Sequence, residues 1–218
     1  MEKKQILEAL KKLRESSKKR NFSQSVDLII NLKEIDLKKP EEQVDFFTTL
    51  HYPSAKKRKV CAFVDGQLLD DAKAIFDKII TPDDFDQYSK DKKTAKKLAG
   101  EYDFFVAQAN LMPKVAAAFG RYLGTRGKMP NPKAGCVVPP KGAALKPLYE
   151  KLQNTIKVTA KTAPLIQVFV GKEDLKDEEL AENLLEIYSQ VESKLPRGKN
   201  NIKSAFVKFT MSNSEKIA

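Results

Sequence analysis

The sequence predicts an α/β protein of two domains, in which a parallel α/β domain is inserted into a discontinuous α+β domain. Two observations lead to this fold class. Segments near both ends of the 218-residue chain, 22–32 and 202–211, alternate apolar and polar residues as half-buried strands do. In the middle, continuous apolar runs at 59–64 and 103–109 are each followed by an amphipathic segment. That pattern is typical of βα units around a buried parallel sheet.

We expect the terminal domain to be a split βαβ-like structure of antiparallel strands and two helices. The first helix, residues 3–19, places Ile6, Leu7, Leu10 and Leu13 at helical spacing and carries a basic outer face. The second helix is expected at 176–195. Beyond the two strands already named, the remaining strands of this domain are expected at 44–50, 155–160 and 164–171.

The inserted domain is expected to be Rossmann-like, with three layers. Its predicted helices lie at 68–79, 113–124 and 144–153, and the basic segment 90–98 reads as the solvated face of another helix. Residues 124–142 hold four Gly and four Pro, so we predict a long, functional loop there. The predicted boundaries are 1–57 and 154–218 for the terminal domain and 58–153 for the insert, since domain termini often lie close together.

The charge balance favours a polyanionic partner. Forty Lys and Arg against 29 Asp and Glu give a net charge of +11, which attracts RNA, DNA or an anionic membrane. Membrane is the weakest of the three, because no apolar run approaches the ~20 residues of a spanning helix and the N-terminus lacks a signal-peptide pattern. Two cysteines far apart in sequence argue against a disulfide scaffold and fit a reducing cytosol.

Groups for catalysis or metal binding are scarce. His51 is the single histidine and is interpreted as a surface residue in a turn. Cys61, inside an apolar strand, is expected to be a buried small hydrophobe, whereas Cys136, in the Gly/Pro-rich loop, is expected to be exposed enough to react but to lack a base. We therefore expect no catalytic residue, no metal site and no cofactor.

Two acidic clusters and one glycine-containing stretch need separate interpretation. The clusters could hold a metal or open helices, and we favour helix opening because acidic side chains suit a helix N-terminus; they comprise Asp83, Asp84 and Asp86, and Asp174, Asp177, Glu178 and Glu179. The stretch GRYLGTRGKM fails as a phosphate loop. Tyr122 stands where a glycine is required, Met129 replaces the Ser or Thr for magnesium, and a helix rather than a strand precedes it.

Two features could contact RNA. In the final strand Ser204, Phe206, Lys208 and Thr210 share one face, and this mixture of hydroxyl, ammonium and aromatic groups suits RNA, although an ordinary half-exposed strand remains an alternative. The basic run 56–59, with Arg126, Lys128 and Lys133 of the long loop, could extend a phosphate track onto the second domain; a solvated linker or a nuclear targeting signal is the alternative.

The segment GTRGKMPNPKAG resembles the signature loop of the universal ribosomal large-subunit protein one family. RNFSQSVDLIINLKEIDLKKPE, DFFVAQANLMP and SAFVKFTM also resemble this family, specifically its archaeal branch, in the same order along the chain. The resemblance implies RNA contacts by strand residues of the terminal domain, at Phe22, Gln24, Ser25, Ser204, Thr210 and Met211. We add Lys208 from the face of the final strand, and take Arg126, Lys128 and Lys133 as candidate contacts of the insert.

The resemblance also implies a function. Such a protein is a structural constituent of the large ribosomal subunit in the cytoplasm, binding large-subunit ribosomal RNA and neighbouring components in the mobile stalk beside the exit site for transfer RNA. It assists release of deacylated transfer RNA and represses translation of its own messenger RNA. Three positions depart from the family pattern: Ser212 replaces a common Gly, Thr125 a common Pro and Cys136 a common Thr. If a glycine at 212 allows a positive φ or a close approach of RNA, serine should cost about 1 kcal/mol unless the turn has shifted.

The rival function is an enzyme that binds a nucleotide at the strand ends of the inserted domain, where this fold type often places such sites. The turn after the first strand of the insert, DGQLL, offers one glycine where a nucleotide-binding turn is rich in them. We therefore predict an RNA-binding protein and no enzymatic activity.

Overall fold

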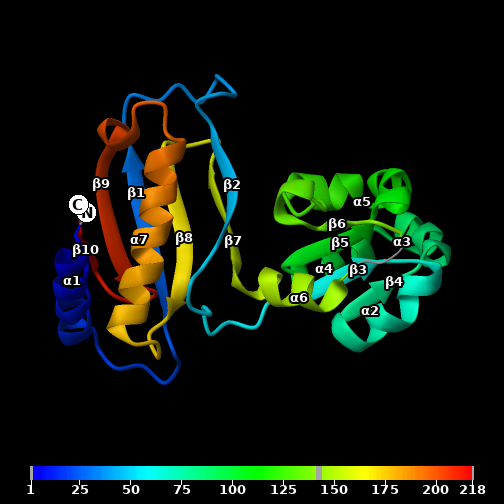
Figure 1. Cartoon of the computed structure of the whole chain (residues 1–218), viewed down its shortest axis with the longest axis horizontal. Coiled ribbons are helices and arrows are strands. Elements are labelled where there is room, and N and C mark those ends of the chain that lie inside the picture. Colours follow the sequence, from blue (N-terminus) through cyan, green and yellow to red (C-terminus); the bar gives the residue numbers. More distant parts are fainter. Residues whose placement is uncertain (1, 141–143, 218) are drawn as a thin grey trace. The chain divides into compact units, whose positions relative to one another are not determined.

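The computed structural model of the chain describes residues 2–140 and 144–217. Residues 141 and 142 of the predicted loop, and the end residues Met1 and Ala218 of the predicted terminal domain, lie outside the described residues. Contacts divide the chain into a terminal unit, Met1–Lys56 with Asn154–Ala218, and an inserted unit, Lys57–Gln153 (Figure 1). This boundary lies one residue from the predicted one. Both units mix helices and strands, which confirms the α/β class.

The terminal unit contains a four-stranded antiparallel sheet in the order β10-β9-β1-β8. Its strands are β1 (Ser25–Leu32), β8 (Leu165–Lys172), β9 (Ile202–Phe209) and β10 (Ser214–Lys216). Every second residue of β1 is buried, as the alternation of its sequence predicted. The two central strands, β1 and β9, therefore come from opposite ends of the chain.

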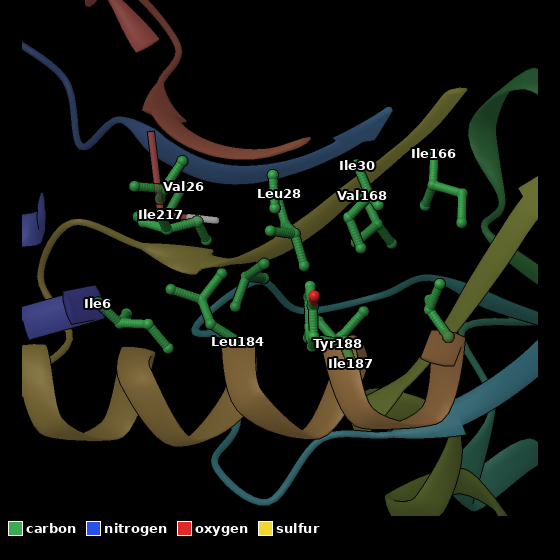
Figure 2. Packing of buried hydrophobic residues seen from close by; sticks show 14 of the residues in the cluster. Ile6, Val26, Leu28, Ile30, Ile166, Val168, Leu184, Ile187, Tyr188 and Ile217 are labelled. Atoms are coloured by element: carbon green, nitrogen blue, oxygen red, sulfur yellow. The ribbon is translucent and has the colours of Figure 1, made fainter. Parts of the chain in front are cut away.

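Two helices cover one face of this sheet, α1 (Lys3–Ser16) and α7 (Asp177–Lys194) (Figure 1). Ile6 of α1 and Leu184, Ile187 and Tyr188 of α7 face Leu28 and other apolar residues of the sheet in one core (Figure 2). Each fully buried Ile or Leu contributes about 1.5–3 kcal/mol to folding. The core therefore fixes which face of the sheet is left open.

A second, two-stranded sheet belongs to the same unit. Strands β2 (Val44–Thr49) and β7 (Thr155–Ala160) pair antiparallel, with Phe46 opposite Val158. Val44, Ile156 and Val158 add their side chains to the core under α7. These two strands lead into and out of the inserted unit.

The inserted unit is built on a parallel sheet in the order β4-β3-β5-β6. The strands are β3 (Val60–Phe63), β4 (Lys78–Ile80), β5 (Phe104–Gln108) and β6 (Val137–Val138), and the helices are α2 (Leu69–Ile75), α3 (Phe85–Lys90), α4 (Lys92–Glu101), α5 (Met112–Thr125) and α6 (Leu145–Asn154). Helices α3, α4 and α5 pack on one another over a core of Phe63, Phe105 and Phe119. The ring of Phe76, directly after α2, packs edge-on against the ring of Tyr149 in α6.

Several predicted elements need correction. The first helix ends at Ser16 rather than at residue 19. The helix predicted over 68–79 ends at Ile75, because Lys78–Ile80 pairs as edge strand β4 with β3. The Gly/Pro-rich loop holds the two-residue strand β6, and β10 was not predicted. Strands this short carry no readable period, so only their pairing partners reveal them.

Candidate RNA interface

The start of β1 and the end of β9 form one hydrogen-bonded frame. The Ser25 N–H donates to the Thr210 hydroxyl at 3.0 Å, and the Thr210 N–H donates to the Ser25 carbonyl at 3.1 Å. The Met211 N–H donates to the side-chain oxygen of Gln24 at 3.1 Å. Gln24 is 2% exposed, so its side chain holds the neighbouring segment and does not itself face solvent. The structure thus brings together four residues that the resemblance implied as RNA contacts.

Two apolar side chains project from this frame into solvent. Phe22 is 51% exposed and Met211 is 59% exposed, and they are the large hydrophobic side chains that the described part of the chain leaves exposed. Exposed apolar groups beside polar ones mark interaction surfaces. An aromatic ring and a flexible thioether can stack against an unpaired base, whereas they gain little from water.

Ser212 closes the turn after this frame, and the strain expected for it is absent. Its φ is not positive, in contrast to Glu34 and Ala55. Its hydroxyl accepts a hydrogen bond from the Phe209 N–H at 2.9 Å, and its N–H donates to the Phe209 carbonyl at 3.3 Å. The cost expected for serine if the turn needed a positive φ therefore does not arise, and the hydroxyl supports the turn.

The open face of the sheet continues the interface away from the frame. Directly opposite residues of antiparallel strands share a face. One row holds Lys208, Asp27 and Phe169, and the next holds Phe206 and Ile29. A depression of about 260 Å³ lies among Asp27, Ile29, Phe169 and Lys208. The sheet therefore offers rings and a cation on the face that α1 and α7 leave uncovered, as predicted for Phe206 and Lys208.

An acidic group lies within this basic face. The pKa of Asp27 is raised, because the effect of burial is larger than the opposing effect of the Lys208 ammonium across the strands. The carboxylate offsets part of the positive charge that Lys208 would present to a phosphate. Asp27, Ile29 and Phe169 were missed from the sequence, although they occupy the positions between the buried residues of β1 and β8.

Ser204 lies at the other end of β9, opposite Asn31 of β1. The Asn31 amide donates a hydrogen bond to the Ser204 hydroxyl at 2.9 Å. At about 3.3 Å per residue, six residues of strand separate Ser204 from Thr210 by roughly 20 Å. The predicted contact residues therefore span the length of the sheet and do not form one cluster.

A basic segment lies between the end of α1 and the frame. Lys18, Lys19 and Arg20 are exposed, and one residue separates Arg20 from Phe22. Further back, the Arg14 guanidinium lies 5.9 Å from the centre of the Phe209 ring and donates to Asp177 at 2.7 Å. The three exposed cations extend positive charge beside Phe22, and the run of basic residues was the signal that sequence reasoning left unused.

The candidate contacts of the insert have different roles. The Lys128 ammonium is half-buried and donates to the carbonyls of Ala99 and Tyr102 at 3.2 and 2.6 Å. It therefore binds the C-terminal end of α4, where a cation suits the helix dipole. Arg126 and Lys133 are exposed. Only these two of the three candidates present their charge to solvent.

The basic run 56–59 is largely engaged within the protein. Lys57 lies 4.0 Å from Asp77 and Lys59 lies 3.2 Å from Glu101. Arg58 donates to the Gln153 carbonyl, and burial lowers its pKa. The Lys56 ammonium lies 5.9 Å from the centre of the Phe169 ring, at the open face of the terminal sheet. Lys56, the one cation of the run that belongs to the terminal unit, thus lies beside its open sheet face.

The residues weighed for catalysis show no reactive arrangement. The expectation that Cys136 is exposed was wrong, because the residue is 3% exposed. Its backbone is paired on both sides, since its N–H donates to the Asn131 carbonyl and its carbonyl accepts from the Ala107 N–H of β5. Burial raises the pKa of Cys136 to about 11. Cys61 is buried, as predicted, and burial raises its pKa further. His51 is exposed and its ring lies 3.3 Å from Glu186.

Six of the seven residues of the acidic clusters open helices, as predicted, whereas Asp174 lies in the turn before α7 and accepts a hydrogen bond from the Ser23 hydroxyl. Asp177, Glu178 and Glu179 stand in the first turn of α7, and Asp83, Asp84 and Asp86 in the first turns before and within α3. Within the described residues, no group of three or more His, Cys, Asp or Glu side chains is placed to hold a metal ion. The described helices also include none that is long and apolar enough to cross a membrane.

The strand ends of the insert are filled by a side chain. Gln108, at the end of β5, is buried, and its amide nitrogen donates to the Asp65 carbonyl at 3.1 Å. Its amide oxygen accepts from the Asp65 N–H at 3.2 Å. This pair joins the ends of β3 and β5 at the place where the rival prediction puts a nucleotide.

Comparison with known proteins agrees with the resemblance seen in the sequence. Residues 10–213 match the model of the Ribosomal protein L1p/L10e family. The chain is 43% identical over 208 residues to the large ribosomal subunit protein uL1 of Methanobrevibacter smithii, covering 95% of each chain. It is 38% identical over 212 residues to uL1 of Thermococcus kodakarensis, covering 97% of this chain and 96% of that one. These relatives bear the names of ribosomal proteins, not of enzymes. The chain therefore belongs to the ribosomal protein L1p/L10e family.

Proposed function

We propose that the protein is a structural component of the large ribosomal subunit and binds a folded region of large-subunit ribosomal RNA through its terminal unit. The observation that carries the proposal is the exposure of Met211 on the hydrogen-bonded frame and of Phe22 two residues before Gln24 of that frame. An exposed ring and thioether on a rigid support are pre-organised for contact with unstacked bases.

Different groups on this surface supply fit and affinity. The Thr210 hydroxyl is held in the backbone frame, and backbone groups beside it can meet ribose hydroxyls and phosphate oxygens. Lys208 on the open face and the exposed cations at 18–20 add salt-dependent attraction to phosphates. We include Ser25 and Ser204 as hydroxyl contacts, and Gln24 as a residue that acts through Met211.

The finer parts of the function follow from family membership and charge. The insert would contact transfer RNA leaving the ribosome, with Arg126 and Lys133 as exposed cations, and so assist its release. The same terminal interface would bind a similar structure in the protein's own messenger RNA and limit its translation. The protein would act at the ribosome in the cytoplasm, beside other components of the large subunit.

Filter binding tests the RNA assignment directly. The pure protein is titrated against fragments of large-subunit ribosomal RNA with excess transfer RNA as competitor, across a salt series. We expect nanomolar-range binding to one fragment that survives the competitor. Weak, steeply salt-dependent binding to every fragment would contradict specific recognition and leave a generic basic protein. If transfer RNA binds Arg126→Gln as tightly as it binds the wild type, the role of that arginine is contradicted.

A further inference from the structure

Helix α4 of the inserted unit carries four lysines on the side away from its core. Lys92, Lys93, Lys96 and Lys97 are all exposed. At about 100° per residue they cover an arc of about 140°, and the buried residues Ala95, Leu98 and Ala99 lie on the opposite arc. The helix therefore has one apolar face and one lysine face.

Little negative charge opposes this lysine face. Within the described part of the chain, no carboxylate lies within 4.0 Å of the four ammonium groups, whereas Lys3 of α1 and Lys73 of α2 each pair with a carboxylate. The carboxylate of Asp91 accepts hydrogen bonds from the backbone of Lys93 and Thr94 at the start of the helix. The remaining acid of α4, Glu101, pairs with Lys59.

Such an arrangement destabilises an isolated helix. Lys92 with Lys96, and Lys93 with Lys97, are like charges four residues apart, and each such pair costs roughly 0.2–0.5 kcal/mol. A polyanion bound along the helix would attract all four ammonium groups, and their proximity would then favour the bound state. The lysine face is thus an unfavourable surface for the free protein and a favourable one for a complex with phosphates.

The long loop adds a fifth cation to the same side. Gly100 follows the lysines on this arc, and the Arg126 guanidinium lies 3.0 Å from the position that a Cβ of residue 100 would take. The absence of a side chain at Gly100 therefore leaves room for Arg126 against the helix. Lys128 binds the end of α4 through two carbonyls and so fixes the loop that carries Arg126.

Charge is also unevenly distributed along the insert. Residues 60–91 hold eight acidic and three basic residues, whereas residues 92–153 hold three acidic and twelve basic ones. The positive potential of the insert is therefore concentrated in the half of its sequence that begins with α4, where it can attract a polyanion.

We infer that the lysine face of α4, continued by Arg126, is a second RNA-binding surface that contacts the phosphate backbone without reading sequence. It is distinct from the interface of the terminal unit, and it shares Arg126 with the transfer-RNA contact proposed for the insert. It rests on the proposed function in taking RNA as the polyanion. Lysines four residues apart have Cβ atoms about 6 Å apart. Their long side chains can therefore each reach a different phosphate.

A salt series on the full chain tests this surface. The probe is an RNA duplex of arbitrary sequence, and the test variant combines Lys93→Gln, Lys96→Gln and Lys97→Gln. A matched control combines Lys73→Gln, Lys146→Gln and Lys151→Gln, which removes the same charge from α2 and α6. Circular dichroism checks that both variants are folded, and polyglutamate serves as a probe for an acidic protein partner.

The slope of log K against log salt is negative, and we expect the test variant to reduce its magnitude by about 2 to 3, since each phosphate contact contributes about one unit. The control variant should leave the slope unchanged. Equal slopes in the test and control variants would overturn the inference, as would weaker polyglutamate binding with unchanged duplex binding. A wild type that binds ribosomal RNA no more tightly than the duplex would contradict the proposed function alone.

Discussion

The side-chain oxygen of Gln24 accepts a hydrogen bond from the backbone N–H of Met211 at 3.1 Å, although 187 positions separate the two residues in sequence. Gln24 is buried and Met211 is exposed. A side chain that solvent hardly reaches thus fixes the backbone from which an exposed side chain projects.

Replacing Gln24 by Leu should therefore weaken RNA binding without removing an exposed group. The Met211 N–H loses its partner, so we expect the free energy of unfolding to fall by about 1–3 kcal/mol. Urea denaturation and filter binding measure the two effects. Gln87→Leu, at an exposed position of α3, is the control. Unchanged RNA affinity in the Gln24 variant would show that Met211 does not need this support.

Truncating the exposed apolar side chains should weaken RNA binding and leave the stability of the protein nearly unchanged. Phe22→Ala and Met211→Ala remove little buried surface, so stability should change by no more than about 0.5 kcal/mol. A lost stacking contact should cost about 1–3 kcal/mol of RNA binding. Binding isotherms at constant salt, with thermal unfolding in parallel, measure both quantities.

The hydroxyl of Thr210 provides a related comparison. Thr210→Ala removes the acceptor of the Ser25 N–H, and we expect it to weaken RNA binding more than the loss of any one surface lysine, such as Lys146→Ala. RNA affinity unchanged in both Thr210→Ala and Phe22→Ala would contradict the assignment of the interface to this frame.

Removing the charge of Asp27 should strengthen RNA binding. Asp27→Asn deletes a negative charge beside Lys208, and we expect a gain of a few-fold at low salt that shrinks as salt rises. Burial raises the pKa of Asp27. The folded state therefore holds this proton more tightly than the unfolded state, and the wild type loses stability as pH rises through the raised pKa. The variant should be more stable at pH 7, with no advantage below the ordinary pKa of 3.8. Weaker RNA binding by the variant would mean that Asp27 positions Lys208.

Lys128 should matter for stability more than for RNA contact. Lys128→Met removes the two hydrogen bonds that its ammonium donates at the end of α4. We expect a loss of about 1–3 kcal/mol, because these are charge-assisted bonds to carbonyls. Lys133→Met, which removes an exposed charge from the same loop, should leave stability nearly unchanged. Denaturant titration gives the free energy of unfolding of both variants. Equal values for Lys128→Met and Lys133→Met would contradict the structural role of Lys128.

Glycine should be less favourable than serine at position 212, although the family pattern suggested the reverse. Ser212→Gly removes the acceptor of the Phe209 N–H and gives the unfolded chain more freedom. We expect a loss of about 1 kcal/mol. Thermal unfolding of the variant measures it, and a higher Tm would show that serine strains the turn.

The sequence predicted most helices and strands because an element that is buried on one face has apolar residues at a regular spacing. The alternation of β1 and β9 and the apolar stripe of α1 have this property. Strands β4, β6 and β10 were missed because each is at most three residues long and is defined by its pairing with a neighbour. Local patterns cannot report a pairing partner.

The sequence predicted the residue types of the candidate interface better than their burial and contacts. Residue types on the final strand indicated its polar and aromatic face, and the resemblance added Phe22, Gln24, Ser25 and Met211. The sequence did not reveal that Gln24 is buried or that Lys128 binds the end of α4, since both depend on contacts between segments far apart in the chain. The burial of Cys136 likewise depends on the pairing of its carbonyl with β5.

The position of β9 between β10 and β1 has a consequence for synthesis of the protein. The inserted unit is built from one continuous stretch and can fold as soon as residue 153 has left the exit tunnel. The terminal sheet lacks a central strand until residue 209 has emerged. A nascent chain therefore carries β1 with an unpaired edge from the emergence of β1 until that of β9, and the hydrogen bonds of Ser25 with Thr210 and of Gln24 with Met211 form only after residue 211 has emerged. The RNA recognition that we propose for this surface thus requires a chain that already includes residue 211, so shorter nascent chains would not compete for the RNA.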